Sequence, residues 1–239
     1  MATRPVFLPS PGDLLVRQVD VEFQWHPGFA LSQKRKNVKA LHEAAEVAGL
    51  GQSFLEISTR SESALGVTLS AFNLRITIAG RLEPVSVEAA FQSSKVFSGS
   101  GRQVHLLDVA DGREIKARIR ELDAETLIGF EFQGEPWLLS PPTALYDYLY
   151  LKALTDLIQS NPEIEDRLLA VEAFTDIEFN PVKSLSCQAR TCALFVGLGG
   201  YKPTRDIIES RESFVSLLNS ARYGPSNPKR VADDPPTLF

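Results

Sequence analysis

The sequence predicts a single α+β domain that is rich in helices and has short strands, most of them in its N-terminal half. Three observations support this fold class. Residues 13–25 alternate loosely between apolar and polar side chains, several later segments repeat apolar residues at helical spacing, and no Pro/Gly/Ser-rich linker or internal repeat divides the chain. We therefore expect one domain over residues 1–222, followed by a tail at 223–239 that is disordered or bound to the surface.

The composition is that of an ordinary globular protein. With 44% hydrophobic and 23% charged residues in 239 positions, the chain can bury a sizeable core. It contains no run of about 18 apolar residues, so we expect no membrane span, and its N-terminus lacks the apolar core of a signal peptide. The spacing of Cys187 and Cys192 fits neither a zinc motif nor a disulfide, and His26, His42 and His105 are scattered. We expect a reduced, cytoplasmic protein without a metal.

The charge balance argues against one class of partner. A formal net charge of −5 does not suit a general nucleic-acid coat, which would be basic. A local patch can still grip a few nucleotides. The candidates are the 34–36 run with Lys39, and Arg222 with Lys229 and Arg230; the alternative for the first is an ordinary solvated helix face.

The first quarter of the chain predicts a β-segment followed by a helix. Residues 5–25 are expected to be extended, and Pro27-Gly28 breaks this segment. Ser32 is the expected N-cap of a helix that reaches about Ala48 and carries an apolar stripe. A short strand is expected at 54–58.

A polar, hydroxyl-rich loop follows that strand at 59–63. Its backbone N–H groups and hydroxyls, with Ser58 and Arg60, suit the binding of a phosphate. The alternative is a plain surface turn into a helix that Ser61 caps. The chain is then expected to be extended over 69–78.

Residues 86–97 are expected to form a short helix capped by Ser86. Glu88, Gln92 and Lys95 stand at positions i, i+4 and i+7, so they share one face of that helix. The residues alone leave two interpretations open. The face is either a solvated charged surface or an acid/base group beside a nucleophilic lysine.

The C-terminal half is expected to alternate helices with short extended segments. Helices are expected at 111–122, 143–160, from 162 to about 173, at 186–198 and at 204–222, with a hairpin at 127–139 that turns at Gly134 and an extended segment at 174–181. The helix at 143–160 is apolar on all sides, which is typical of a buried helix.

Two polar groups stand out in this half. Glu172, Asp176 and Glu178 lie within nine residues, which suits either an acidic site or a solvated helix end and strand. Gln188 and Arg190 open the next helix, where they can contact a phosphate or a base, or simply cap the helix and form a salt bridge.

Two stretches carry a resemblance to a known family. Leu69-Ser-Ala-Phe-Asn73 precedes an extended stretch and then Val85-Ser-Val-Glu-Ala-Ala-Phe-Gln-Ser-Ser-Lys-Val-Phe97. These resemble the NADAR family, in the superfamily that includes the riboflavin-intermediate N-glycosidase, whose members carry Ser-Asn-Phe and then Trp-Pro-Thr-Ser-Glu-His-Tyr-Phe-Gln-Ala-Gln-Lys-Phe. The Glu, Phe-Gln and Lys match in spacing, whereas Ala71 and Ala89 replace the usual Asn and His.

The resemblance spans about residues 5–220 and is strongest to the antitoxin branch associated with DarT-type DNA ADP-ribosyltransferase toxins. In the second region, Glu172 and Asp176 fall on the family's acidic positions, and Phe179 stands where its Trp would. The resemblance implies hydrolysis of the N-glycosidic bond between ADP-ribose and a guanine of DNA, with no metal or redox cofactor.

The resemblance also implies roles for individual residues. Glu88 would be the acid/base, Lys95 a nucleophile that passes through a Schiff base, and Asp176 a group that orients water or steadies the charge on the sugar. Contacts to the substrate are expected from Ser58, Arg60, Ser70, Phe72, Asn73, Gln92, Glu172, Gln188 and Arg190. The phosphate contacts among these, Ser58, Arg60 and Arg190, rest on residue type rather than on the motif.

Two other functions remain open. The chain can be a glycosidase for a small free metabolite, such as a riboflavin-pathway intermediate, or a module that binds ADP-ribose without turnover. The partners implied by the antitoxin branch are ADP-ribosylated single-stranded DNA, ADP-ribose as product and a DarT-type toxin, and no membrane.

Overall fold

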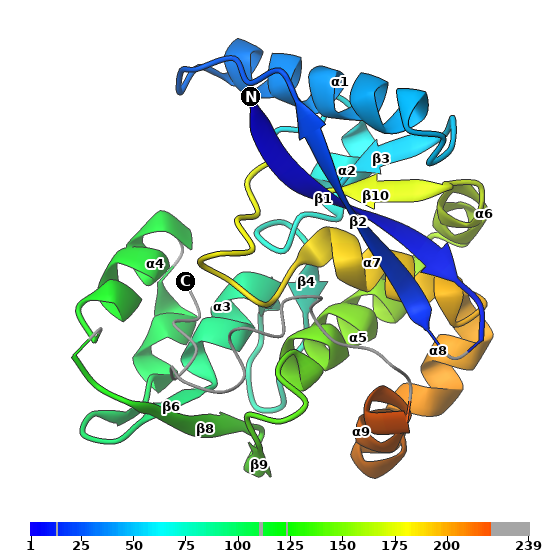
Figure 1. The fold of residues 1–239 in the computed structure, drawn as a ribbon. Helices are drawn as coiled ribbons and strands as arrows, with labels where there is room; N and C mark the ends of the chain where they lie inside the picture. The colour runs from blue at the N-terminus through cyan, green and yellow to red at the C-terminus, as the bar shows by residue number, and fades with distance from the viewer. Residues whose placement is uncertain (13, 110–111, 123, 221–239) are drawn as a thin grey trace.

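The structure is a computed structural model, and it describes residues 1–12, 14–109, 112–122 and 124–220. It confirms the α+β fold class. Helices pack on both faces of an N-terminal four-stranded sheet, and a second four-stranded sheet lies at the other end of the molecule (Figure 1).

Two further expectations concern the C-terminal end and membranes. The predicted tail at 223–239, with the basic residues Arg222, Lys229 and Arg230, lies outside the described residues. Within the described ranges, no helix is both long enough and apolar enough to cross a bilayer.

The N-terminal sheet has the strand order β2-β1-β10-β3. Its strands are β1 (Ala2–Ser10), β2 (Leu15–Phe23), β3 (Phe54–Glu56) and β10 (Ala173–Thr175). β1 pairs antiparallel with β2 and β10, and β10 pairs parallel with β3. The segment predicted to be extended over 5–25 is therefore a hairpin of two strands, because the chain turns near Gly12, whose φ of +98° favours glycine.

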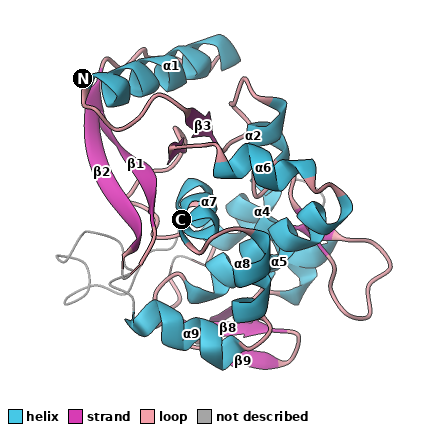
Figure 2. Ribbon diagram, turned by 90° about the vertical axis from the view of Figure 1, so that its right-hand side faces the viewer, coloured by secondary structure: helices cyan, strands magenta, loops and turns pink. Residues whose placement is uncertain are grey.

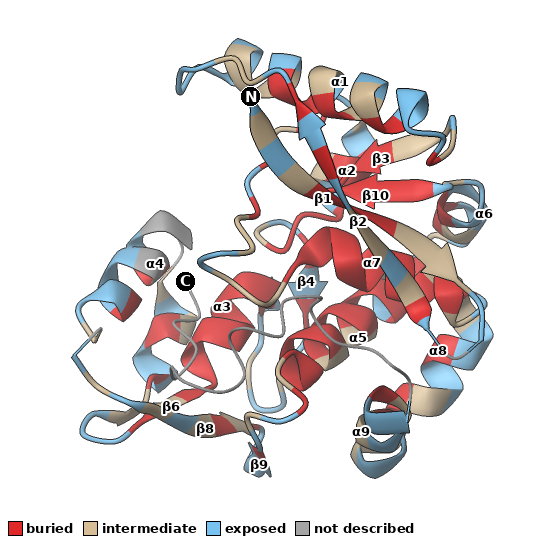
Figure 3. Cartoon of the chain, viewed as in Figure 1, coloured by how far each residue is buried: buried red, intermediate tan, exposed pale blue. Residues whose placement is uncertain are grey.

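Two helices cover opposite faces of this sheet, since successive side chains of a strand point to opposite sides. Val6 of β1 packs with the apolar side chains of α1 (Leu31–Val47), whereas its neighbour Phe7 packs with those of α7 (Gln188–Gly197). Figure 3 shows the buried residues concentrated where the helices meet the sheet.

The helix predicted to follow an N-cap at Ser32 and to reach about Ala48 is α1, and it begins two residues earlier than expected. The residue at its N-cap is Ala30, whose carbonyl accepts the N–H groups of Gln33 and Lys34, so Ser32 is not the cap. The preceding loop is held by the buried Asn37, whose amide exchanges two hydrogen bonds of 2.7 and 2.9 Å with the backbone of His26.

The second sheet has the order β7-β6-β8-β9 and pairs antiparallel throughout. Its strands are β6 (Lys95–Phe97), β7 (Gly101–Arg102), β8 (Leu127–Phe132) and β9 (Glu135–Trp137). The predicted hairpin that turns at Gly134 is confirmed, and the φ of +84° at this residue explains the glycine.

The prediction that residues 69–78 are extended is mostly wrong. Only β4 (Arg75–Ile76) is a strand, paired with β5 (Val85–Ser86). Before it the Ser70 carbonyl accepts the N–H groups of Asn73 and Leu74, both at 2.8 Å, and this bends the chain into a turn after α2 (Ala64–Thr68). Likewise, α2 has Ser63 rather than Ser61 at its N-cap.

The remaining helical elements are α3 (Val87–Ser93), η1 (Val104–Asp108), α4 (Gly112–Arg120), α5 (Ala144–Ser160), α6 (Glu163–Leu169), α8 (Tyr201–Ile208) and α9 (Arg211–Ser220). Helix α5 runs through the middle of the molecule and is buried on most sides, as its apolar sequence predicts (Figures 2 and 3).

The single helix predicted over 204–222 is instead two helices, α8 and α9. The chain breaks at Ser210, whose hydroxyl accepts the N–H of Ser213 at 3.1 Å. A serine oxygen that binds the backbone in this way starts a new helix rather than continuing the old one. The break lets Phe214 reach full burial in the main core.

Candidate active site

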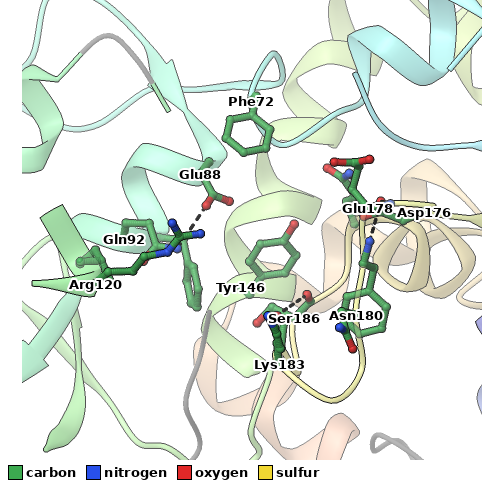
Figure 4. A pocket seen from close by; sticks show the side chains of 15 residues that line it. Phe72, Glu88, Gln92, Arg120, Tyr146, Asp176, Glu178, Asn180, Lys183 and Ser186 are labelled. Atoms are coloured by element: carbon green, nitrogen blue, oxygen red, sulfur yellow. Dashed lines mark hydrogen bonds between the residues drawn. The ribbon is translucent and has the colours of Figure 1, made fainter. Parts of the chain in front are cut away.

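A cavity of about 260 Å³ lies where the first turns of α3, α5 and α7 meet the segment that follows β10 (Figure 4). Because helix N-termini carry partial positive charge, this arrangement favours anionic groups in the cavity. The side chains that line it are Phe72, Glu88, Phe91, Gln92, Ile119, Arg120, Tyr146, Asp176, Glu178, Phe179, Asn180, Lys183, Ser184, Ser186 and Gln188.

The α3 wall of the cavity carries Glu88, Phe91 and Gln92. Ser86 caps this helix as predicted, because its hydroxyl accepts the N–H of Ala89 at 3.1 Å. Glu88 and Gln92 are both buried, and Gln92 Nε2 donates to Glu88 Oε1 at 3.2 Å. Among the described residues the buried Gln92 Oε1 finds no hydrogen-bond partner, so the wall offers an acceptor that a ligand can use.

The prediction that Lys95 shares the helical face of Glu88 is wrong. Helix α3 ends at Ser93, and Lys95 is the first residue of β6, opposite Phe130. The hydroxyls of Ser93 and Ser94 both donate to the Ala90 carbonyl, at 3.0 and 2.7 Å. The chain then continues as β6, which pairs with β8.

Lys95 is almost completely buried and is not among the residues that line the cavity. Its Nζ lies 5.6 Å from the centre of the Phe91 ring, and Phe91 itself lines the cavity. The lysine therefore lies next to the Phe91 ring and outside the cavity lining.

The opposite wall is formed by the residues after β10, among which Asp176 is central (Figure 4). Its Oδ1 accepts the N–H groups of Glu178 (3.0 Å) and Phe179 (3.2 Å), the local turn that aspartate favours at a strand end. Its Oδ2 accepts from Gln188 Nε2 at 2.9 Å, and Gln188 Oε1 accepts the N–H of Ala71 at 2.8 Å. Gln188 therefore ties Asp176 to the turn that carries Phe72.

A second carboxyl, Glu56 of β3, lies near Asp176 and was not singled out from the sequence. It is buried, and its Oε1 accepts from the Ser58 hydroxyl at 2.6 Å and from the Ile177 N–H at 2.9 Å. Its Oε2 accepts from the Thr175 hydroxyl at 2.7 Å. The parallel pairing of β3 with β10 brings the two acidic residues together from distant parts of the chain.

The two carboxyls perturb each other. Burial and the charge of Glu56 raise the pKa of Asp176 to about 8, against the opposing effect of the hydrogen bonds from Glu178 and Gln188. Burial likewise raises the pKa of Glu56. Because two buried like charges are unfavourable, the pair holds a proton near neutral pH.

The Thr175 hydroxyl connects this pair to α1. It lies 2.8 Å from Nε2 of His42, and burial lowers the pKa of that imidazole to about 4, so the ring is neutral at physiological pH. A hydrogen-bonded chain thus runs from His42 through Thr175 to Glu56.

Three further ionisable groups interact with Asp176. Burial lowers the pKa of Arg4 on β1, and the charge of Asp176 partly offsets this effect. Burial raises the pKa of Tyr146 and that of Cys187, so both are uncharged at neutral pH. Tyr146 stands between the two walls and meets Phe91 edge-on, with ring centres 5.2 Å apart (Figure 4).

The cavity thus brings together Glu88, Asp176, Phe72, Gln92 and Gln188 of the predicted site. These five residues come from four separate segments, so their convergence is a property of the fold rather than of any one motif.

Other predicted site residues lie outside the cavity lining. Asn73 is exposed and donates to the Val67 carbonyl at 2.8 Å, which fixes the turn. Ser70 is fully buried next to that turn, and its hydroxyl has no hydrogen-bond partner within the described chain. Glu172 is exposed, and its carboxylate accepts the N–H groups of Gln52 and Ser53, so it closes a loop.

The predicted phosphate contacts also lie elsewhere. The Ser58 hydroxyl is used within the protein, by Glu56 and by the Arg60 N–H. Arg60 Nε approaches Glu178 Oε1 at 4.0 Å, which brings it to the edge of the cavity. Arg190 is buried, with Nη1 3.4 Å from the Thr143 hydroxyl.

Sequence reasoning did not find several residues of the cavity, including Tyr146, Arg120 and Lys183. Tyr146 was hidden in an apolar helix, and Arg120 lies at the end of a charged one, where its spacing carries no signal. Across the described ranges, no group of three or more His, Cys, Asp or Glu side chains could hold a metal ion.

Comparison with known proteins identifies the family. No curated protein matches the chain. A family model described as DarT1-associated NADAR antitoxin matches residues 2–227, which is far more than half of the chain. The resemblance predicted from the sequence is confirmed, and the chain belongs to the DarT1-associated NADAR antitoxin family.

Proposed function

We propose that this protein hydrolyses the N-glycosidic bond between ADP-ribose and guanine bases of DNA and so reverses the modification made by a DarT1-type toxin. The observation that carries the proposal is the pair of buried carboxyl groups, Glu88 and Asp176, on opposite walls of one cavity in a chain of this antitoxin family.

The two carboxyls have complementary tasks in such a reaction. Cleavage of the bond builds positive charge at the anomeric carbon, which a nearby carboxylate stabilises. The departing guanine needs a proton. The raised pKa of Asp176 supports it as the donor, because it keeps its proton at neutral pH. Glu88 then serves as the carboxylate that faces the sugar and activates water.

Lys95 adds a covalent route to the same products. Its deprotonated amine attacks the anomeric carbon, the carbon–nitrogen bond to guanine breaks, and the electron pair leaves on the base, which takes a proton. The sugar ring of the adduct opens to an imine, and water hydrolyses that imine to free ADP-ribose. Because Lys95 is not among the residues that line the cavity, this route requires a local movement that brings its amine into the cavity before attack.

The size and polarity of the cavity support a substrate of this kind. Its volume of about 260 Å³ lies just below the range of about 300–1,000 Å³ typical of ligand pockets. It therefore suits the ribose and the base at the reacting bond, with the diphosphate at the rim near Arg120 and Lys183. Gln92 Oε1 is an acceptor for a sugar hydroxyl or an exocyclic amine.

The test is release of ADP-ribose from a single-stranded oligonucleotide that carries one ADP-ribosylated guanine. We expect free ADP-ribose and the unmodified oligonucleotide by mass spectrometry with the natural protein and not with Glu88→Gln. Lys202→Gln, an exposed change on α8, is the matched control and should retain activity.

Two outcomes would replace the proposal. Cleavage restricted to small free N-glycosides would indicate a metabolite glycosidase. Tight binding of ADP-ribose without release from either substrate would indicate a binding module.

A further inference from the structure

A second hollow, of about 480 Å³, lies beside the N-terminal half of α1. One face of that helix forms it, together with Glu62 from the loop after β3; the helix contributes Leu31, Ser32, Arg35, Lys36 and Lys39. Two stretches that the sequence separately marked as phosphate candidates, the 34–39 cations and the 59–63 loop, therefore meet at one surface.

Three cations, Arg35, Lys36 and Lys39, line this surface with one carboxylate, that of Glu62, so it is locally positive in a protein whose net charge is −5. We call Arg35, Lys36 and Lys39 the α1 basic face. Lys36 and Lys39 are exposed, and the one carboxylate paired with Lys39, that of Glu43, lies 3.7 Å away on the exposed side of the helix. Exposed pairs of that kind contribute little, so the cations remain available to phosphates.

An aromatic side chain stands at the start of the same helix. Phe29 is 97% exposed, and Leu31 beside it is also exposed. A fully exposed phenylalanine next to cations is unfavourable in water, but it matches the stacking platforms on which proteins hold single-stranded nucleic acids.

The helix that carries the basic face also reaches the candidate active site. Lys34, on the same helix, pairs with Glu178 at 2.9 Å, and Arg60 from the adjoining loop approaches the same carboxylate at 4.0 Å. Glu178 lines the cavity. Helix α1 therefore carries the α1 basic face on one side and reaches the edge of the cavity through Lys34 on another.

We propose that the α1 basic face holds the phosphate backbone of the DNA strand next to the modified guanine, with Phe29 stacked on a neighbouring base. This inference rests on the proposed function, because it assumes that DNA carries the substrate. The strand, rather than the ADP moiety, is the occupant, since the hollow is open and an exposed aromatic, Phe29, precedes the helix that forms it, as a chain of bases and phosphates requires.

Binding tests the inference without any need for turnover. The variant Arg35→Gln/Lys36→Gln/Lys39→Gln and the natural protein are titrated with an unmodified single-stranded oligonucleotide, followed by fluorescence anisotropy over a range of salt. Three lost phosphate contacts should reduce the slope of log affinity against log salt by about 2 and weaken binding by about tenfold or more at low salt.

A matched control removes as many charges from another surface. Arg167→Gln/Lys202→Gln/Arg205→Gln changes exposed cations of α6 and α8 and should leave both the affinity and the salt slope near the natural values. Phe29→Ala should weaken binding by about tenfold with little change in the slope, because stacking involves no phosphate. Equal losses in the two triple variants would overturn the inference, since they would report net charge alone.

Measurements of kcat and KM provide a second test of the inference. For the ADP-ribosylated oligonucleotide, the α1 variant should show a KM raised about tenfold or more with kcat little changed. For ADP-ribosylated guanosine without a strand, KM and kcat should match those of the natural protein. Equal effects on both substrates would contradict the inference. If the natural protein cleaves neither substrate, the proposed function fails, and the binding arm still decides whether α1 holds a strand.

Discussion

The two walls of the cavity are built on the same plan with opposite chemistry. On the α3 wall Glu88 faces the cavity and a buried amine, that of Lys95, lies next to the Phe91 ring. On the β10 wall Asp176 faces the cavity and a buried carboxyl, Glu56, lies nearby. Each wall thus presents a carboxyl to the cavity and has a second ionisable residue close by that is not among the lining residues.

We assign the roles of Glu88 and Asp176 from the residue that lies near each of them, Lys95 on the α3 wall and Glu56 on the β10 wall. Burial and the neighbouring carboxyl of Glu56 favour the protonated form of Asp176, so the β10 wall holds a proton at neutral pH. The α3 wall places an amide, Gln92, beside Glu88 and an amine nearby, which suits a carboxylate and a nucleophile. The comparison predicts that changes to the two walls affect activity in different ways.

The largest expected effect comes from Lys95. Lys95→Ala should lower turnover on the order of 10³-fold or more if the amine is the nucleophile. Borohydride should reduce the imine of the natural protein to a stable adduct that mass spectrometry assigns to Lys95. Because truncation of a buried lysine can also unfold the chain, circular dichroism must show a folded variant. If borohydride trapped the adduct on another lysine, Lys95 would not be the nucleophile.

The next effect separates the two carboxyls that face the cavity. Glu88→Gln and Asp176→Asn should each lower kcat by about 10²- to 10³-fold, as expected for the loss of acid/base catalysis. A substrate analogue whose leaving group needs no proton should rescue Asp176→Asn and not Glu88→Gln. Rescue of the Glu88 variant instead would exchange the two roles.

A smaller effect tests Glu56, the buried carboxyl near Asp176. Glu56→Gln removes the charge that disfavours ionisation of Asp176, so the pKa of Asp176 should fall and the alkaline loss of kcat should move from about pH 8 to lower pH. Glutamine fits the site, because the Thr175 hydroxyl can accept from the amide and donate to the neutral His42 ring. A variant with lower activity and an unshifted pH profile would limit Glu56 to a structural role.

The smallest effect concerns stability. The pKa of Asp176 is about 8 in the folded protein and 3.8 ordinarily, so between these pH values the folded state binds more protons than the unfolded state. Stability therefore falls as pH rises through this window. Asp176→Asn removes the contribution, so its unfolding free energy should decline less steeply between pH 4 and 8 by denaturant titration. Parallel curves for the two proteins would contradict the raised pKa.

Sequence reasoning recovered the parts of the site that local chemistry determines. Ser86 caps α3, which puts Glu88 and Gln92 at the cavity, and Asp176 ends a strand in the turn that aspartate favours. It placed Lys95 wrongly because the helix ends at Ser93, two residues before Lys95, where β6 pairs with β8, and helical spacing cannot reveal that pairing.

Long-range contacts account for what was missed. Glu56 meets Asp176 only because β3 and β10 are parallel neighbours, and the two strands are separated by nearly half of the sequence. Glu172 and Asn73 matched the motif, yet each is engaged by nearby backbone groups that no pattern of residues displays. Segments that the fold brings together from a distance remain invisible until the topology is known.

Helix α1 has two sides whose substitution would have different consequences. Its inner side is fixed, because Leu41 packs on the sheet and His42 joins the chain of hydrogen bonds that ends at Glu56. Its outer side carries Arg35, Lys36 and Lys39, which line the open hollow beside Glu62. Under the proposed function, substitutions on the outer side would change how tightly a DNA strand is held, whereas substitutions on the inner side would disturb the hydrogen-bonded chain that reaches Glu56.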